Sequence, residues 1–529
     1  MREFVLDGDA RHGPDVLAAM AGGVTLDGGL AWANGGRSQA SRRSWLDTFD
    51  WRLYRAGLTL EQAACRDRTD LILTGRDGET MAEQQLTPAT APRWPCLVSE
   101  LPPGPIRELV EPVAGVRALC PVVRATSKVT ELRALNDDAK TVARLAVDRM
   151  AVTFPARAAP PVRLMLSPVR GYAGITDRIG GAISGVPGIV AARGSALETV
   201  LAAAGLHAGD LPGKAAAVPL SPSIPAAQGL AAILTALLDA VEANVPGTRR
   251  DIDSEFLHDL RIAVRRTRSA LKLCGRVLPA GLTREYRAEF RWLGDLTTPT
   301  RDLDVYLLDF GRMTAGLIAA APADLTPFHD YLVRSRAAQH RRLVAGLRSA
   351  RFARLTLSWR AALEEIRPAR KRPTLAQLAA DRLSAAQRKA LRAGQLISPG
   401  SPPESLHELR KRCKELRYLI EMFGSLYDPG QRWQAVRELK ALQDCLGSFQ
   451  DAEVQLTEIR AFARQLLADR SVPAETLLAM GEIAAGLAVA QRDARREFDG
   501  RFADFASEAS QDRLAELTRI AGPAGGAGR

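Results

Sequence analysis

Basic side chains at helical spacing are the residues of this chain best suited to a chemical role. Two segments each carry four of them at intervals of three and four residues: His258, Arg261, Arg265 and Arg268, then His407, Arg410, Lys414 and Arg417. Residues three and four apart share one face of an α-helix, so each set forms a continuous stripe. Arginine offers paired donors that match phosphate oxygens. The stripes therefore indicate a surface that binds an anion.

The stripes are also compatible with two roles that involve no anion. A charged helix face can be solvated and paired with acids of neighbouring helices, although acids are nearly absent from the stripes themselves. The two histidines could instead bind a metal ion, but no cysteine pair or acidic cluster accompanies them, and the six cysteines show no metal-ligand spacing. We expect no metal site, no cofactor and no catalytic residue.

The two stripes belong to an internal repeat with a constant offset of 149 residues. The segment HDLRIAVRRTRSALKLCGRVL, from His258, aligns without gaps on HELRKRCKELRYLIEMFGSLY, from His407. The same offset places RWLGDLTTPTRDLDV, from Arg291, on KALQDCLGSFQDAEV, from Lys440. One register kept across both segments predicts two similar helical halves related by an approximate two-fold axis.

The secondary-structure patterns before and after the Pro- and Ala-rich segment 206–228 differ. Residues 1–205 mix short alternating runs with frequent Gly and Pro, whereas the later part is helical, with breaks at 279–281, 319–327, 367–373, 399–403 and 428–430. We therefore expect a multi-domain α+β protein, whose second domain is an all-α bundle. The expected segments are an α+β domain at 1–205, a linker at 206–228, the helical domain at 229–515 and a flexible tail at 516–529.

Composition narrows the class of partner. The chain of 529 residues is long enough for two or more cores, and it has a net charge of +12 and a pI near 9.7. Most of this surplus lies beyond residue 220, which favours nucleic acid, anionic lipid or a phosphate polymer. The longest apolar stretch, 230–241, is too short to cross a membrane, and the start MREFVLDGD lacks the apolar segment of a signal peptide. We expect a cytoplasmic protein with no membrane partner and an unknown oligomeric state.

Four motifs in order resemble a known helical family. HxxRxxxRRxRxxLxL and LGxxTxxxRDxDV in the first half, then HxxRxxxKxLRYxxE and LKxLQDxLGxxQDxEV in the second, are similar to the CHAD domain, the conserved histidine α-helical domain. The resemblance covers roughly residues 225–510. It implies a helical bundle of two pseudo-symmetric halves that binds inorganic polyphosphate, and some members occur on polyphosphate granules.

The resemblance and the basic helices together define the candidate polyphosphate-binding residues. These are the stripe residues His258, Arg261, Arg265, Arg268, His407, Arg410, Lys414 and Arg417, with Arg266, Lys272, Arg291, Arg341, Arg348, Lys411 and Lys440. Four acids of the motifs are expected to cap or support the helices instead of binding metal: Asp302, Asp304, Asp451 and Glu453.

The first domain resembles the CYTH domain, a β-barrel tunnel of the triphosphatase type. SWLDTFDWRLYRAGLTL, from Ser44, is similar to the strand and hairpin of that family, and GVPGIVAARGSALETVLAAAG, from Gly185, to its closing segment. An active member needs alternating inward acids to hold divalent metal against a triphosphate. Here the start supplies Glu3 alone, and VRLMLSPV, from Val162, has no acid. We expect a degenerate domain without phosphohydrolase activity.

The sequence thus predicts non-catalytic binding of inorganic polyphosphate by a granule-associated or sensing scaffold. Two alternatives remain: a metal-dependent triphosphate tunnel hydrolase, and a helical protein that binds nucleic acid. Binders of single strands usually interleave aromatic side chains for base stacking, whereas the stripes hold only Tyr418. That composition favours a partner without bases.

Overall fold

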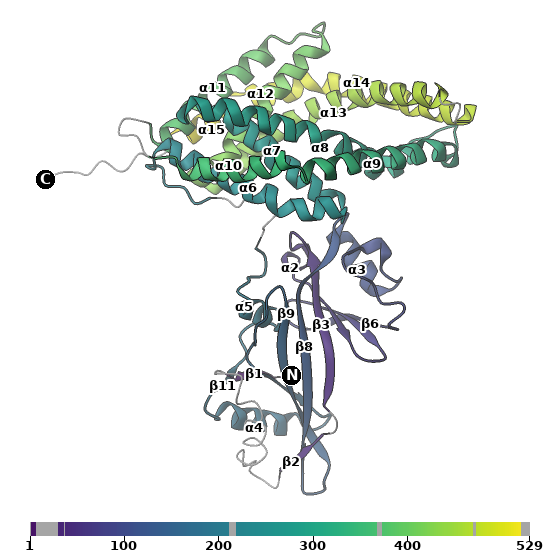
Figure 1. Cartoon of the computed structure of the whole chain (residues 1–529), viewed down its shortest axis with the longest axis vertical. Helices are drawn as coiled ribbons and strands as arrows, with labels where there is room; N and C mark the ends of the chain where they lie inside the picture. Colours follow the sequence, from purple (N-terminus) through teal and green to yellow (C-terminus); the bar gives the residue numbers. More distant parts are fainter. Residues whose placement is uncertain are drawn as a thin grey trace, which may run out of the picture. The chain divides into compact units, whose positions relative to one another are not determined.

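The computed structural model describes residues 2–6, 30–35, 38–210, 218–367, 373–468 and 472–519. The chain divides into two compact units, Met1–Leu211 and Pro212–Arg529 (Figure 1). The first is built on an antiparallel sheet and the second is helical. The predicted fold class is therefore confirmed.

Unit 1 is an antiparallel sheet with the strand order β11-β1-β10-β9-β8-β3-β4-β5-β6, and β2 and β7 also pair with β8. The strands are β1 (Arg2–Leu6), β2 (Ala31–Asn34), β3 (Gln39–Thr48), β4 (Thr59–Ala64), β5 (Thr69–Thr74), β6 (Thr80–Leu86), β7 (Cys96–Leu97), β8 (Ala118–Leu135), β9 (Thr141–Phe154), β10 (Arg163–Pro168) and β11 (Ile189–Ala191). The helical elements are α2 (Arg52–Arg55), η2 (Val98–Glu100), α3 (Pro105–Ala114), α4 (Ala173–Ser184) and α5 (Ala196–Ala203).

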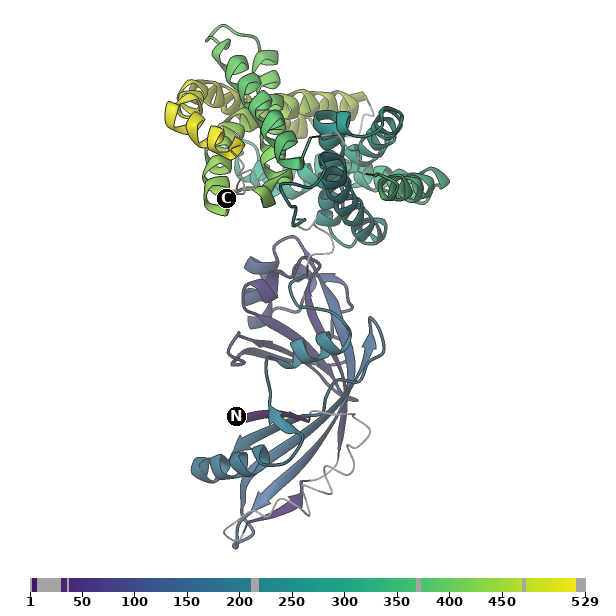
Figure 2. The ribbon, with the colours of Figure 1, turned by 90° about the vertical axis from the view of Figure 1, so that its left-hand side faces the viewer.

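Around residues 123–128 of β8 and 148–152 of β9, alternation buries one face of the sheet and leaves the other open, whereas further along the same strands, at Leu132 and Leu145, the opposite face is buried. In β8 and β9, Ser127, Asp148 and Met150 are buried, whereas their neighbours Lys128 and Ala151 are exposed. Because successive side chains point to opposite faces of a strand, the buried set shares a single face. That face packs against α5, and Figure 2 shows the sheet curved, with helices on its concave side.

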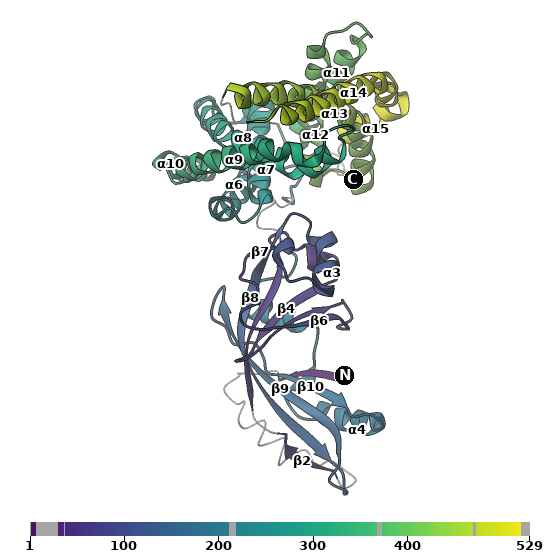
Figure 3. The ribbon, with the colours of Figure 1, turned by 90° about the vertical axis from the view of Figure 1, so that its right-hand side faces the viewer.

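The sheet is not closed. Its outer strands, β11 and β6, do not pair with each other among the described residues, so the expected barrel-like tunnel is an open, curved sheet here (Figure 3). The sheet remains compatible with a CYTH-like fold. The hairpin expected from Ser44 is present as β3 and β4 joined through α2, and the expected closing helix is α5.

Unit 2 consists of helices, and each predicted break falls at a helix boundary, whereas the helix ends at Arg250, Leu347, Ala468 and Ala506 were not predicted. The helices are α6 (Ala226–Arg250), α7 (Ser254–Cys274), η3 (Gly275–Val277), α8 (Ala280–Ala315), η4 (Pro322–Leu325), α9 (Thr326–Leu347), α10 (Ala350–Glu364), α11 (Leu375–Gln395), α12 (Pro403–Met422), η5 (Gly424–Leu426), α13 (Pro429–Ala468), α14 (Ala474–Ala506) and α15 (Glu508–Thr518). The offset of 149 residues relates the starts of α6, α7, η3 and α8 to those of α11, α12, η5 and α13. The repeat thus extends beyond the motifs that revealed it.

One core joins both halves of the helical unit. Apolar residues of α6, α7 and α12 pack together in it, including Leu234, Leu260 and Leu416, each 0% exposed. The helix α6 is longer than its apolar stretch suggested, and by length and composition alone it could cross a membrane, with a mean hydropathy of 1.4 over 18 residues. Since 61% of that window is buried, we assign α6 to the core.

The predicted segment boundaries can be placed on the structure. The division after Leu211 falls within the segment predicted as a linker, while α6 begins at Ala226, slightly before the predicted end of that linker. In the predicted tail, α15 continues to Thr518, and residues 520–529 lie outside the described residues.

Candidate functional site

The two basic stripes lie on α7 and α12, which contact each other. Arg266 of α7 bonds to Glu421 of α12 (2.8 Å), and Lys272, further along α7, bonds to Glu415, earlier on α12 (2.5 Å). The helices therefore run antiparallel. We call the surface formed by the eight stripe residues of the two helices the basic seam: His258, Arg261, Arg265, Arg268, His407, Arg410, Lys414 and Arg417.

These two ion pairs reflect the symmetry of the repeat. Shifting Arg266 and Glu421 by the repeat offset gives Glu415 and Lys272, the second pair. An approximate two-fold axis between α7 and α12 exchanges the two ion pairs in this way. The cations of both pairs come from the first half and the acids from the second, so the two helix faces are complementary in charge. Polyphosphate binding by Arg266 and Lys272 stays a prediction, and both side chains have acidic partners here.

Cations of the two halves meet across the seam. The guanidinium of Arg265, from α7, lies 5.6 Å from the ring centre of Tyr418, on α12. Burial lowers the pKa of Lys414 to about 8, and the neighbouring charges of Arg410 and Arg265 act in the same direction. The stripes are therefore one continuous basic surface.

In the first half, polar but uncharged partners hold the basic side chains. Arg261 donates to the hydroxyls of Thr297 (3.3 Å) and Thr298 (2.6 Å) on α8, and burial lowers its pKa. Arg268 lies over Gly294 of the same helix, where an added Cβ would come within 2.6 Å of its Nη1. Glycine at this position lets the guanidinium approach the α8 backbone.

In the second half, acids hold the equivalent side chains. The partners are Glu453 for His407 (3.0 Å), Asp451 for Arg410 (3.0 Å) and Glu421 for Arg417 (2.6 Å). Amide side chains add to them, because Arg410 also donates to Gln450 (2.7 Å) and Arg417 to Gln443 (3.3 Å). The second half of the seam is thus partly neutralised by its own carboxylates.

Three seam cations have no carboxylate partner within the described part of the chain. No ion pair or hydrogen bond to an acid joins Arg265, Arg268 or Lys414 there, and near Lys414 the charges of Arg410, Arg265 and Arg417 outnumber that of Asp451. Like charges held together in a partly buried place repel, and a bound anion relieves that repulsion. These three residues are the strongest candidates for contact with a ligand.

His258 and His407 are each the fifth residue of their helices, α7 and α12. At the start of α7, the carboxylate of Asp253 accepts hydrogen bonds from the amides of Glu255 and Phe256. These two amides are therefore capped by the protein itself and do not bind an anion. Burial lowers the pKa of His258, and nearby Arg301 lowers it too.

The remaining predicted residues differ in their relation to the seam. Arg268 reaches Gly294 of α8, and Arg417 reaches Gln443 of α13. Arg291 lies one helical turn before Gly294, and Lys440 one turn before Gln443, so each lies on the helix face that the seam contacts. Three others are exposed: Lys411, which pairs with Glu408 at 3.8 Å, and Arg341 and Arg348 at the end of α9. No hydrogen bond or ion pair connects the latter two with the seam in the described ranges.

The support role predicted for the four acids agrees with their contacts. Glu453 and Asp451 hold seam residues, Asp304 accepts from Arg336 of α9 (2.8 Å), and Asp302 lies near enough to Arg261 for that charge to lower its pKa, although burial raises it more.

The sequence did not identify Arg301, which lies beside His258 and donates to the carbonyl of Ser254 (3.3 Å). The repeat places Arg301 opposite Gln450, which does not match it in charge. Its position within the motif LGxxTxxxRDxDV was the available signal.

At the buried face of unit 1, the acids Glu3, Glu61 and Asp148 have arginine partners. Arg43 donates to Glu61 (2.6 Å) and to Asp148 (2.8 Å), and Arg163 bonds to Glu3. No group of three or more metal-binding side chains occurs among the residues that the structure describes. The arrangement does not fit the divalent metal that active tunnel enzymes of this type use.

A helical bundle of two repeated halves with a basic seam between them is the class of domain that this geometry defines. Residues 232–460 match the model of the CHAD domain family, so the chain carries a CHAD domain. Among solved structures, the CHAD domain from the plant Ricinus communis is 23% identical, covering 55% of this chain and 96% of that one, with a TM-score of 0.47. PptA from Streptomyces chartreusis is 20% identical, covering 52% and 99%, with a TM-score of 0.40. No curated protein matches the chain.

Proposed function

We propose that the helical unit binds inorganic polyphosphate non-covalently through the basic seam. The observation that carries the proposal is the position of Arg265, which lies over Tyr418 of α12 and close enough to Lys414 for its charge to lower the pKa of that amine, so cations from both repeats share one partly buried surface. A phosphate chain places a negative charge on every unit, so a single ligand can neutralise several of these cations together. The CHAD resemblance supports the same ligand.

The biological setting belongs to the same proposal. A protein that binds this polymer without cleaving it serves as a scaffold or sensor, and we place it in the cytoplasm, on polyphosphate granules. The acids of unit 1 that carry arginine partners favour this role over a metal-dependent hydrolase.

A nucleic acid is the second candidate ligand, since the same cations attract its phosphates. Its bases would need aromatic surfaces for stacking. Tyr418, the aromatic residue of the stripes, has the guanidinium of Arg265 over its ring. A polymer without bases therefore fits the seam better.

Titration of the full chain with long-chain polyphosphate, single-stranded DNA and heparin at near-physiological salt tests the proposal. We expect polyphosphate to bind at least about tenfold more tightly than the other two, which corresponds to about 1.4 kcal/mol. Affinity should fall with added salt, because binding releases counterions. Equal affinity for all three polymers would reduce the seam to a general basic surface.

Polyphosphate binding should weaken as the pH rises from 7 to 9. The pKa of Lys414 is about 8 in the free protein, so its positive charge is lost over this range, and losing one charged contact reduces affinity by roughly tenfold. A bound anion favours the charged form, so the complex should take up a proton near pH 8. Calorimetry in buffers of different ionisation enthalpy measures this uptake.

The variant Lys414→Arg is the control for the pH effect, because arginine stays charged throughout this range. It should bind polyphosphate with little change between pH 7 and 9. If the affinity of this variant fell with pH as much as that of the original chain, another group would be responsible.

A further inference from the structure

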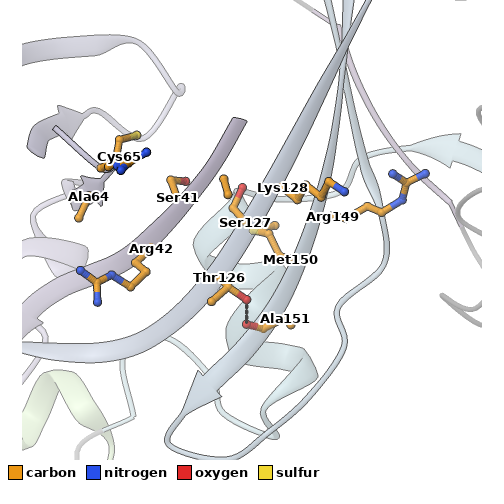
Figure 4. A pocket seen from close by; sticks show the side chains of 12 residues that line it. Ser41, Arg42, Ala64, Cys65, Thr126, Ser127, Lys128, Arg149, Met150 and Ala151 are labelled. Carbon is orange, nitrogen blue, oxygen red and sulfur yellow. Dashed lines mark hydrogen bonds between the residues drawn. The ribbon is translucent and has the colours of Figure 1, made fainter. Parts of the chain in front are cut away.

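A second basic surface lies on unit 1, apart from the buried ion pairs of that unit. A hollow of about 490 Å³ opens between β3, β4, β8 and β9 (Figure 4). Four cations from these strands and their ends line it: Arg42, Arg66, Lys128 and Arg149. The remaining lining residues carry no acid.

Strand register explains how these cations come together. Arg42 pairs with Ala64 on one side and Thr126 on the other, and Lys128 pairs with Arg149 on β9. Cross-strand partners share a face of the sheet, and so do residues two apart on one strand. Because Lys128 follows Thr126, the partner of Arg42, by two residues on β8, Arg42 and Lys128 lie on the same face. The lining residues between them are small, including Ala40, Ala64 and Ala151, which leaves the hollow unfilled.

The two faces of this sheet differ in whether their cations have acidic partners. On the buried face, Arg43 is paired with Glu61 and Asp148. On the open face, Arg42 and Lys128 are exposed, and no acid forms an ion pair with either among the described residues. Arg42 and Lys128 thus lack, among the described residues, the acidic partners that Arg43 has on the other face.

We infer that this hollow is a second anion site, which takes a short stretch of inorganic phosphate chain. Cations on several strands around an unfilled hollow can contact successive phosphate groups. Aromatic side chains do not line the hollow, so it offers no stacking surface for a base. The site is separate from the seam, and its failure would leave the proposal for the helical unit untouched.

Cys65 lines the hollow and gives a local readout. In the full chain we expect tripolyphosphate to slow alkylation of Cys65, measured by peptide mass spectrometry, by about tenfold at ten times its Kd. Cys120 is also partly exposed and does not line the hollow, so its alkylation rate should stay constant. The protection should persist in a chain whose seam carries Arg265→Ala, Arg268→Ala and Lys414→Ala.

The double variant Arg42→Ala, Lys128→Ala should lose the protection. A matched control, Lys140→Ala with Arg144→Ala, removes two exposed cations of unit 1 that do not line the hollow, and it should keep the protection. The inference is overturned if tripolyphosphate gives no protection, if the seam variant abolishes it, or if single-stranded DNA protects Cys65 equally well.

Discussion

Replacing Arg265, Arg268 and Lys414 together by alanine is expected to weaken binding of long-chain polyphosphate roughly 100- to 1,000-fold. Each change removes one charge-assisted contact worth about 1 to 1.5 kcal/mol, and 1.4 kcal/mol corresponds to a factor of ten. The slope of affinity against salt should also become shallower, because fewer counterions are released. Titration of the full chain over a series of salt concentrations measures both effects.

The fold should survive these changes, because the three side chains have no carboxylate partners in the described ranges and cations outnumber acids near Lys414. Removing them relieves repulsion instead of leaving an acid unpaired. The charge-matched control replaces Arg312, Arg496 and Arg501, which acids of their own helices already neutralise. An equal loss of affinity in the control would attribute binding to net charge, and full affinity in the seam variant would exclude the seam as the site.

The difference between the two halves also predicts which part of the seam contributes most. On α7, Arg261 bonds to threonine hydroxyls, while on α12 its counterpart Arg410 bonds to Asp451. A phosphate that approaches Arg410 must compete with a carboxylate in direct contact, whereas at Arg261 it displaces hydroxyls, and the nearby Asp302 forms no ion pair with Arg261 among the described residues. We therefore expect the first half of the repeat to supply the larger part of the binding free energy.

Much of the helical unit could be predicted from the sequence, because its repeat is direct. A constant offset between His258 and His407 aligns helix starts as well as motifs, and Pro and Gly breaks mark the helix ends. The contact between α7 and α12 could not be predicted. Periodicity shows which residues share a helix face but does not identify the helix that packs against it, so the acid partners Glu415 and Glu421 appeared only in the structure.

The sheet unit was harder to predict for a related reason. The hairpin around Asp47 was found because alternation and a short turn are local signals. Closure of a sheet depends on pairing between its outer strands, which are distant in sequence, and the expected barrel is an open sheet. Likewise, Arg42 and Arg43 are adjacent in sequence, but alternation along β3 places Arg42 on the open face and Arg43 among buried acids.

Changing Arg43 to methionine is expected to destabilise unit 1 by about 3 to 5 kcal/mol, the usual cost of removing one partner from a buried ion pair. Arg43 is 17% exposed, and its partners Glu61 and Asp148 are 15% and 1% exposed. Burial lowers the pKa of Arg43, but attraction by the two acids outweighs it and keeps the pKa raised. Calorimetry of the full chain should show a transition of unit 1 lowered by roughly 10 °C.

The source of that loss can be separated into charge and packing. A triple variant with Arg43→Met, Glu61→Gln and Asp148→Asn removes the same cation but leaves no unpaired carboxylate, so it should recover most of the stability. If the triple variant were as unstable as Arg43→Met alone, the role of Arg43 would be packing against Trp45, whose ring centre lies 4.7 Å from the guanidinium. Recovery would instead show that the buried face of this sheet keeps its acids because Arg43 neutralises them. The same neutralisation leaves those acids unsuited to hold a metal ion, which connects the stability of unit 1 with the absence of hydrolase activity expected for it.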